Sequence, residues 1–91
     1  MRIVGGIHRG RQFSPGKNFK ARPTTDMAKE SLFNILTNQV DFEEIKILDL
    51  FAGTGSISFE FLSRGCTDIT TIEFNCQHHQ FIRSVVQRIA K

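Results

Sequence analysis

The chain has 91 residues, of which 40% are hydrophobic and 23% are charged. That composition is ordinary for a globular protein, and no apolar run approaches the roughly 20 residues that are needed to span a bilayer. The stretch from Met1 to Ile7 contains neither a long apolar segment nor a cleavage site of small residues, so nothing indicates export. We therefore expect a cytoplasmic protein with no membrane partner and with room for one core and one site.

The charge is divided unevenly along the chain. The first 22 residues contain six basic side chains and no acidic one, whereas the remainder contains six basic and nine acidic side chains. A basic arm on a mildly acidic domain is typical of proteins that bind a phosphate-bearing polymer, because each cation that neutralises a phosphate releases counterions. We predict a nucleic-acid partner for this arm, and a solvated hairpin is the alternative.

The two cysteines, Cys66 and Cys76, form no C-x-x-C pair, and a cytosolic setting keeps them reduced. We interpret both as small hydrophobic residues. A metal site could be assembled from Cys76, His78 and His79. A structural zinc ion requires four well-spaced ligands, however, and this cluster offers three crowded ones on an expected helix, so no metal is predicted.

A basic β-hairpin arm with a loop is predicted for residues 1–22. Short β-prone pieces at 3–4 and 11–13 flank several glycines, which favours a hairpin that turns near Arg9 and Gly10. The following residues include a proline and a glycine and therefore predict a loop.

An N-terminal helix with a linker is predicted for residues 23–44. The helix should begin at Thr24 or Thr25, because either hydroxyl can cap it, and Asp26 would then lie in the first turn, where the helix dipole favours a negative charge. Its apolar side chains recur at helical spacing and predict one buried face: Ala28, Leu32, Ile35 and Leu36.

Strand and helix patterns alternate over residues 45–91. An apolar run at 45–51 predicts a central strand, and residues 56–64 predict a helix that Gly65 ends. β-branched residues at 69–74 predict a second strand, and a last helix follows from about Cys76. This order indicates a βαβ unit with parallel strands and a right-handed crossover. The side chains expected to face the core are Ile57, Phe61 and Leu62 in the first of these helices, and Ile82, Val85, Val86 and Ile89 in the second.

A glycine-rich loop joins the first strand to the following helix. Gly53 and Gly55 allow the chain to turn tightly and its backbone to approach a ligand closely. Glu73 stands 18 residues beyond Gly55, at the end of the next strand. That offset matches the acidic residue that binds a ribose diol in nucleoside-binding βαβ units. The combination predicts a nucleoside site.

Asp49 indicates which nucleoside this is. A dinucleotide's pyrophosphate would lie at the helix N-terminus and would be repelled by this carboxylate, whereas S-adenosylmethionine is cationic and carries no phosphate. The third glycine of the dinucleotide motif is replaced by Ser58, and no G-K-[ST] ends the loop, which excludes a P-loop. The alternative is that Asp49 is a strand-end residue satisfied by backbone amides and that Glu73 is a solvated acid.

Three segments carry a more specific pattern: residues 1–10 (MRIVGGIHRG), 22–36 (RPTTDMAKESLFNIL) and 48–60 (LDLFAGTGSISFE). In this order they resemble the opening of the bacterial small-subunit rRNA guanine-N2 methyltransferases, and the similarity continues through 63–65 and Glu73. The middle segment is the most specific, because a generic βαβ unit does not require it. The resemblance implies an α/β, Rossmann-like class I methyltransferase fold.

The resemblance also implies transfer of a methyl group from S-adenosylmethionine to the exocyclic amine of a guanine in ribosomal RNA of the small subunit. The methionine moiety would be held by Asp49 and the glycines, the ribose hydroxyls by Glu73, and the adenine by Phe74. The implied cofactor-binding residues are Asp49, Phe51, Ala52, Gly53, Thr54, Gly55, Glu73 and Phe74. The implied RNA-binding residues are Arg9, Arg11, Lys17, Lys20, Arg22, Thr24 and Thr25.

The chain departs from that family in one respect. Such enzymes resemble other amino-methyltransferases in carrying Asn or Asp, two prolines and an aromatic residue on a later strand, whereas the two prolines here, Pro15 and Pro23, are not adjacent. We therefore expect a truncated βαβα half-domain at 45–91 that contains no catalytic residue and self-associates through its unpaired sheet. A non-catalytic RNA-binding module and a dimerising βαβ domain without a ligand are the alternatives.

Overall fold

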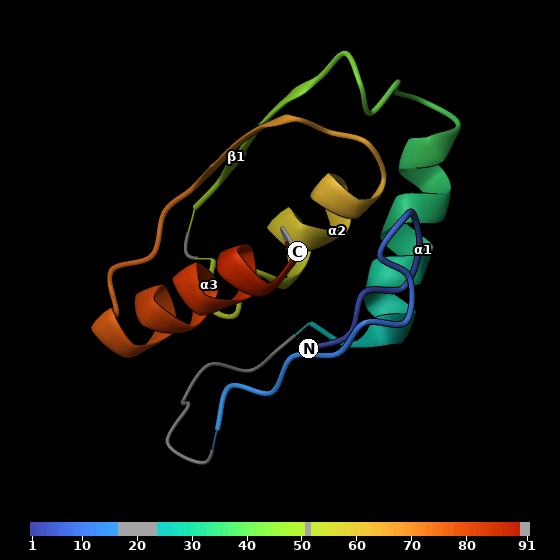
Figure 1. Ribbon diagram of the computed structural model, residues 1–91. Coiled ribbons are helices and arrows are strands. Elements are labelled where there is room, and N and C mark those ends of the chain that lie inside the picture. The colour runs from blue at the N-terminus through green and yellow to red at the C-terminus, as the bar shows by residue number, and fades with distance from the viewer. Residues whose placement is uncertain (17–23, 51, 90–91) are drawn as a thin grey trace.

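The computed structural model describes residues 1–16, 24–50 and 52–89. Strands β1 (Lys46–Asp49) and β2 (Asp68–Thr71) lie side by side and parallel, with Lys46 paired to Asp68 and Asp49 paired to Thr71 (Figure 1). The predicted order of elements and the parallel pairing are confirmed. The elements are α1 (Asp26–Thr37), β1 (Lys46–Asp49), α2 (Ser56–Ser63), β2 (Asp68–Thr71) and α3 (Cys76–Ile89).

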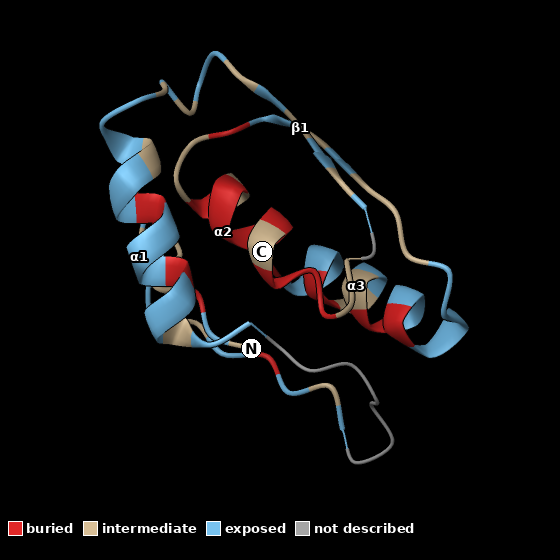
Figure 2. Ribbon diagram, turned by 180° about the vertical axis from the view of Figure 1, so that it is seen from behind, coloured by how far each residue is buried: buried red, intermediate tan, exposed pale blue. Residues whose placement is uncertain are grey.

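Helix α2 lies at the centre of the molecule, and most of its residues are buried, polar ones included (Figure 2). Of the three side chains predicted to face inward, Phe61 is buried, while Ile57 and Leu62 are only half-buried. That prediction assumed a helix with one apolar stripe, whereas α2 is enclosed on several sides. Gly65 follows the helix with φ of 113°, which is the left-handed conformation expected of a glycine that ends a helix.

Two apolar clusters pack against different sides of α2. The first joins the N-terminal residues to α2 and α3, and the second joins α1 to α2 and the sheet. In the second, the rings of Phe33 and Phe61 meet edge to face with centroids 4.6 Å apart. The buried members of the first cluster are Ile3, Phe13, Phe59, Phe81, Val85 and Ile89. Those of the second are Phe33, Phe61 and Cys66.

The predicted buried face of α1 is wrong in part. Phe33 and Lys29 are the buried side chains of this helix, with Leu36 half-buried. The other three residues of the predicted face are exposed, Leu32 by 42% and Ile35 by 58%, together with Ala28. The spacing of residues along the helix is compatible with burial of either the predicted aliphatic face or the face that contains Lys29 and Phe33. The helix turns the larger aromatic ring of Phe33 into the core and pairs Lys29 with a buried carboxylate on α2. The start of α1 is as predicted, because Thr25 Oγ1 accepts a hydrogen bond from the amide of Ala28 at 3.1 Å.

The predicted face of α3 is correct at Val85 and Ile89, which are buried. Val86, by contrast, is 50% exposed and Ile82 is half-buried. The remaining buried side chains of the helix belong to His78 and Phe81. The buried stripe is therefore centred one position earlier than the run of aliphatic residues suggested.

The N-terminal residues form an antiparallel ribbon that is less regular than the predicted hairpin. Arg2 and Gln12 make a single isolated bridge, and the amide of Phe13 donates to the carbonyl of Met1 at 2.9 Å. The reversal is wider than a turn at Arg9 and Gly10, because the amides of Val4 and Gly5 already point to α2 rather than to a partner strand. The antiparallel pairing is confirmed. Within the described residues, however, one isolated bridge replaces the two short strands predicted at 3–4 and 11–13.

Glu60, a fully buried residue of α2, attaches this ribbon to the rest of the fold. Its two carboxylate oxygens accept the amides of Val4 and Gly5, each at 2.9 Å. Arg64 Nε lies 2.8 Å from the same carboxylate, and Lys29 Nζ lies 3.6 Å from it. A buried carboxylate is tolerated only when it is paired and hydrogen-bonded in this way. The N-terminal ribbon is thus fixed to the centre of the domain.

The sheet is open on the side that faces away from α2. Leu48 is 61% exposed and Leu50 is 53% exposed. Within the described residues β1 pairs with β2 alone, so the central position predicted for this strand is not observed there. Alternation explains the exposure, because Ile47 faces α2 and its neighbour Leu48 must then face the other way.

Candidate functional site

The glycine-rich loop is held against the end of β2. The amide of Ala52 donates to the carbonyl of Ile72 at 3.0 Å, and the amide of Gly55 donates to Ala52 at 2.9 Å. Gly53 and Gly55 have φ of 59° and 77°, a region that other residues rarely adopt. Residues 52–55 therefore form a fixed turn before α2 rather than an open connection.

Gly55 is required for packing as well as for its conformation. A Cβ atom at this position would lie 2.8 Å from the ring of Phe59 and 3.2 Å from Cγ1 of Ile82. The absence of a side chain therefore lets α3 approach the start of α2. The same glycine that shapes the loop also brings the two helices together.

The side chain of Glu73, two residues after β2, contacts the glycine-rich loop. Its Oε1 accepts the amide of Gly53 at 2.5 Å, and its Oε2 accepts the amide of Asn75 at 2.9 Å. The amide of Asn75, that of Gly53 and the nearby His78 hold the pKa of Glu73 below its ordinary value, against the opposing effect of burial. A carboxylate, ionised at neutral pH, thus lies at the glycine turn, as the sequence spacing predicted.

Asn75 and His78 support this arrangement and were not among the predicted site residues. Nδ1 of His78 lies 3.7 Å from Glu73 Oε2. The side chain of Asn75 accepts the amides of Gln77 and His78 at 2.9 and 3.1 Å, so it caps α3 while its own amide holds Glu73. An asparagine just before a helix is a recognisable cap signal and could have been found from the sequence.

Asp49, at the end of β1, is half-buried and contacts α2. Its Oδ2 accepts a hydrogen bond from Ser58 Oγ at 2.7 Å, and that hydroxyl also lies 2.8 Å from Thr71 Oγ1. The partner is thus a side-chain hydroxyl rather than the backbone amides of the alternative interpretation. Ser58 was singled out only as the residue that replaces the third glycine of a dinucleotide motif. In the structure, Ser58 also orients the carboxylate of Asp49 through this hydrogen bond.

The remaining predicted cofactor residues differ in exposure. Thr54 is buried, Ala52 is half-buried, and Phe74 is 81% exposed beside Glu73. Phe51 lies outside the described residues. The structure thus brings Asp49, the glycines and Glu73 to one edge of the sheet, and the binding role of this set stays a prediction.

Several residues of the predicted RNA-binding arm have structural partners. Arg11 donates to the carbonyls of Arg88 and Ile89 at 3.0 and 3.4 Å, and the hydroxyl of Thr25 caps α1. Arg9 and Thr24 are exposed. The predicted residues Lys17, Lys20 and Arg22 lie outside the described residues. The RNA-binding role of all of them stays a prediction.

Within residues 1–16, 24–50 and 52–89 no three His, Cys, Asp or Glu side chains gather in an arrangement that could hold a metal ion. Cys66 is buried and Cys76 is exposed, and neither forms a disulfide there. No helix in the same part of the chain is long and apolar enough to cross a membrane.

A parallel βαβ unit with a glycine turn after its first strand is a Rossmann-like arrangement. A solved structure from Escherichia coli, described as a candidate methyltransferase, matches it with a TM-score of 0.83 and 32% sequence identity, over 99% of this chain and 47% of that chain. The predicted fold class is thereby confirmed.

The family model described as conserved hypothetical protein 95 matches residues 1–91. The chain belongs to this family. Ribosomal RNA small subunit methyltransferase D of Escherichia coli K12 is 37% identical over the whole of this chain and 41% of its own length. An uncharacterized methylase of Rickettsia prowazekii is 40% identical over 82% of this chain and 34% of its own length. The chain therefore spans less than half the length of these curated relatives, and the resemblance to small-subunit rRNA methyltransferases is confirmed.

Proposed function

We propose that the glycine turn and its two carboxylates bind S-adenosylmethionine. The observation that carries this proposal is the contact between Glu73 and the amide of Gly53, which fixes an ionised carboxylate at the mouth of the turn. A second carboxylate, Asp49, ends the neighbouring strand. A ligand with cationic groups and a ribose diol suits such a site, and a pyrophosphate does not.

The residues present fit this cofactor in the chemistry of their side chains. Residues 52–55 include no basic side chain, so the turn offers backbone amides and neighbouring acids. When bound, S-adenosylmethionine supplies the methyl group that is transferred. Asp49 and the glycines would hold its methionine part, Glu73 its ribose hydroxyls, and the exposed ring of Phe74 would stack on adenine. Phe51, Ala52 and Thr54 complete the proposed set.

We further propose that the substrate is a guanine in small-subunit ribosomal RNA, methylated on its exocyclic amine. The names of the relatives support a ribosomal RNA substrate, and the choice of guanine rests on the resemblance described above. The basic arm would contact the RNA.

The proposed division of the chain is an arm at 1–22, a helix and linker at 23–44, and a cofactor-binding half-domain at 45–91. Because no adjacent prolines occur in these 91 residues, we expect them to bind cofactor weakly without turnover.

Calorimetry with S-adenosylhomocysteine tests the cofactor proposal. The wild-type chain should release or absorb heat on binding, and Asp49→Ala should bind much more weakly. Asp68→Ala is the matched control, because it removes an exposed carboxylate from the other end of β2. The absence of heat with every variant would contradict the proposal, and so would equal affinity of wild type and Asp49→Ala.

We also propose that a chain of these 91 residues self-associates through its open sheet face. Leu48 and Leu50 are more than half exposed on this face, and within the described residues the outer edge of β1 is unpaired. Sedimentation equilibrium should show a dimer whose population rises with concentration. A Leu48→Lys variant should be monomeric, and a wild-type chain that is monomeric at every concentration would exclude this proposal.

A further inference from the structure

Arg11 and Arg88 hold their guanidinium groups against one aromatic ring. The Arg11 guanidinium carbon lies 5.3 Å from the centroid of Phe13, and that of Arg88 lies 5.0 Å from the same centroid. Phe13 is buried in the first core cluster, so the ring is a fixed platform. The N-terminal ribbon and the last turn of α3 therefore present two neighbouring cations.

Both guanidinium groups are also held by hydrogen bonds. Arg11 donates to the carbonyls of Arg88 and Ile89, which are the last carbonyls of α3, and a cation is favourable at that end of the helix dipole. Arg88 Nη2 lies 3.4 Å from Ser84 Oγ. The positions of the two cations are thus fixed before any ligand binds, which lowers the entropy cost of binding an anion.

The charges of these arginines are not neutralised by the protein. Within the described residues no carboxylate forms an ion pair with Arg9, Arg11 or Arg88, whereas Arg2 is paired with Asp26 at 2.7 Å. Like charges that lie close together repel each other unless an anion lies between them. An anionic partner that binds between these guanidinium groups would therefore reduce their mutual repulsion.

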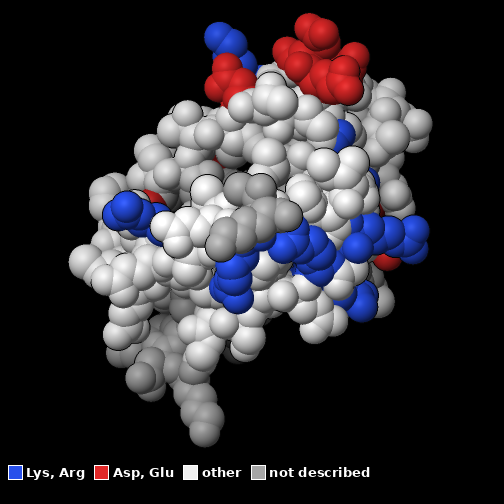
Figure 3. Space-filling view, in the orientation of Figure 1, with Lys and Arg blue, Asp and Glu red and all other residues white. Residues whose placement is uncertain are grey.

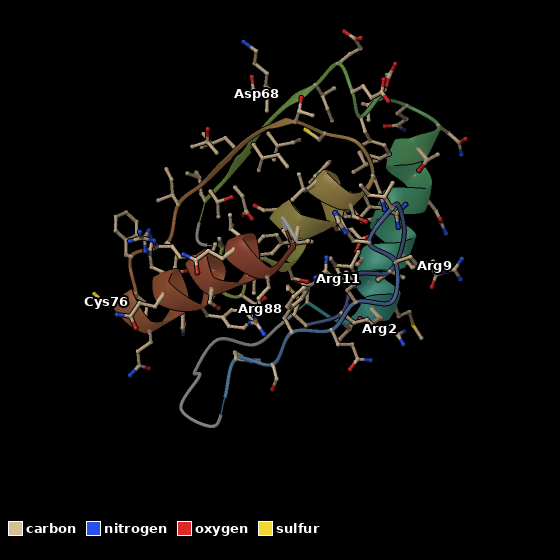
Figure 4. The ribbon with its side chains drawn as sticks, in the orientation of Figure 1. Arg2, Arg9, Arg11, Asp68, Cys76 and Arg88 are labelled. Atoms are coloured by element: carbon tan, nitrogen blue, oxygen red, sulfur yellow. The ribbon has the colours of Figure 1, made fainter. Side chains whose placement is uncertain are left out.

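The four arginines form one band on the surface. Figure 3 shows Lys and Arg side chains gathered across the middle of one face, while Asp and Glu side chains gather at the upper end. Figure 4 places Arg9, Arg2, Arg11 and Arg88 along this band and Asp68 at the acidic end. Two acidic side chains of α1 lie at this end of the band: Asp26 pairs with Arg2 at 2.7 Å, and Glu30 lines a groove with Arg2 and Arg9. We define the basic band as Arg2, Arg9, Arg11 and Arg88.

We propose that the basic band binds the phosphate backbone of RNA and that Arg88, from the cofactor-binding half-domain, is a member of this binding surface. The proposal rests on the ribosomal RNA partner proposed above and extends the contact surface beyond the N-terminal arm. Guanidinium groups suit phosphates because their planar donors can bind two oxygens at once. A row of guanidinium groups, two of which are held on the Phe13 ring, suits a polymer with regularly spaced phosphates better than a single anion. RNA bound along the band would thus contact both the arm and α3.

Fluorescence polarisation of the 91-residue chain with a labelled RNA hairpin tests the proposal. Arg88→Gln should weaken binding several-fold and reduce the slope of log K against log salt by about one, as expected for the loss of one phosphate contact. Lys46→Gln is the matched control, because it removes the same charge from an exposed position at the start of β1. It should leave both quantities unchanged. Arg9→Gln should behave like Arg88→Gln, which keeps the test valid if loss of Arg88 disturbs α3.

The outcomes separate this inference from the cofactor proposal. Heat of S-adenosylhomocysteine binding should be the same for wild type and Arg88→Gln. Equal RNA binding by Arg88→Gln and Lys46→Gln would show that Arg88 is not part of the RNA-binding surface. If polyglutamate competed as effectively as unlabelled RNA, the band would be a site for acidic proteins, and the RNA proposal would be overturned. A wild-type chain that takes up S-adenosylhomocysteine but no RNA would overturn the band alone. Loss of cofactor binding with RNA binding intact would overturn only the cofactor proposal.

Discussion

The carboxylate of Glu73 accepts the backbone amide of Gly53, so the end of the second strand is tied to the turn that follows the first. This contact orders the glycine turn and also places a negative charge where a ribose diol would bind. In Glu73→Gln the side-chain carbonyl can still accept the amide of Gly53, but the charge is lost and the amide of Asn75 then faces an NH2 group instead of an acceptor. Because hydrogen bonds to charged groups contribute about 1.5–3 kcal/mol, we expect affinity for S-adenosylhomocysteine to fall by about 10- to 100-fold.

Isothermal calorimetry measures this change, and Glu43→Gln is its control. Glu43 is an exposed carboxylate in the linker between α1 and β1, so its neutralisation should leave the affinity as it is in wild type. If Glu73→Gln bound the ligand as tightly as this control, Glu73 would not be a ligand-binding residue.

The lowered pKa of Glu73 predicts a pH dependence of stability. The pKa in the folded state lies below the ordinary value of 4.5, so the unfolded state binds more protons in this range. The stabilisation is therefore fully present above the ordinary value and is lost as the pH falls through the folded pKa. Thermal unfolding between about pH 3 and pH 7 should show wild type more stable than Glu73→Gln at the upper end, with the difference shrinking toward the acidic end. A difference that stays constant over this range would contradict the assignment.

Gly55 and Gly10 provide a matched pair for the glycine turn. Both have positive φ, 77° and 86°, but a Cβ at Gly10 would meet no heavy atom within 4 Å, whereas one at Gly55 would lie 2.8 Å from the Phe59 ring. Alanine at Gly10 should cost about 1–2 kcal/mol from its backbone conformation. Alanine at Gly55 should cost about 1–3 kcal/mol more, because the ring and the neighbouring helix must shift. Urea denaturation measures both, and equal losses would show that packing at Gly55 is unimportant.

The order of elements could be predicted from the sequence because each signal there is local. Thr25 caps α1, Gly65 ends α2, and the first part of the β-branched run, residues 69–71, pairs with the first strand as expected. The spacing from Gly55 to Glu73 also placed a carboxylate at the turn, since parallel strands end at the same edge of a sheet. These inferences needed no knowledge of distant contacts.

The helix faces could not be predicted in the same way. For α1 the pattern offered a complete aliphatic face, and Leu32 and Ile35 were assigned to the core. The structure instead buries Lys29 and Phe33, because Glu60 on a helix 31 residues further along the chain supplies a counter-charge for Lys29. A lysine is expected at the surface unless a partner is known, and the partner is visible only in the fold.

Ser58 illustrates the same limit in the candidate site. Its position in the motif showed that a glycine was missing, which argued against a dinucleotide. Its hydrogen bonds to Asp49 and Thr71 depend on how α2 lies across both strands. The sequence could therefore identify the carboxylate but not the hydroxyl that orients it.

The buried pair of Lys29 and Glu60 gives the strongest prediction for stability. Both side chains are at most 1% exposed, and Glu60 also holds the amides of Val4 and Gly5. Removing one partner leaves the other charge buried and unpaired, so Glu60→Gln should destabilise the fold by about 3–5 kcal/mol at neutral pH. Glu30→Gln, which changes an exposed carboxylate on α1, should lie within about 0.5 kcal/mol of wild type.

The pH dependence of Glu60→Gln separates the unpaired charge from a simple loss of hydrogen bonds. Burial already lowers the pKa of Lys29, and the charge of Glu60 opposes this effect. Without Glu60 the pKa of Lys29 should fall further, so the unfolded state binds more protons over a wider range below the ordinary value of 10.5. Stability of the variant should therefore rise with pH across this range more steeply than that of wild type. Urea denaturation at about pH 7 and pH 9 measures this difference, and parallel pH profiles would indicate that the loss comes from the released amides of the N-terminal ribbon and not from the lysine.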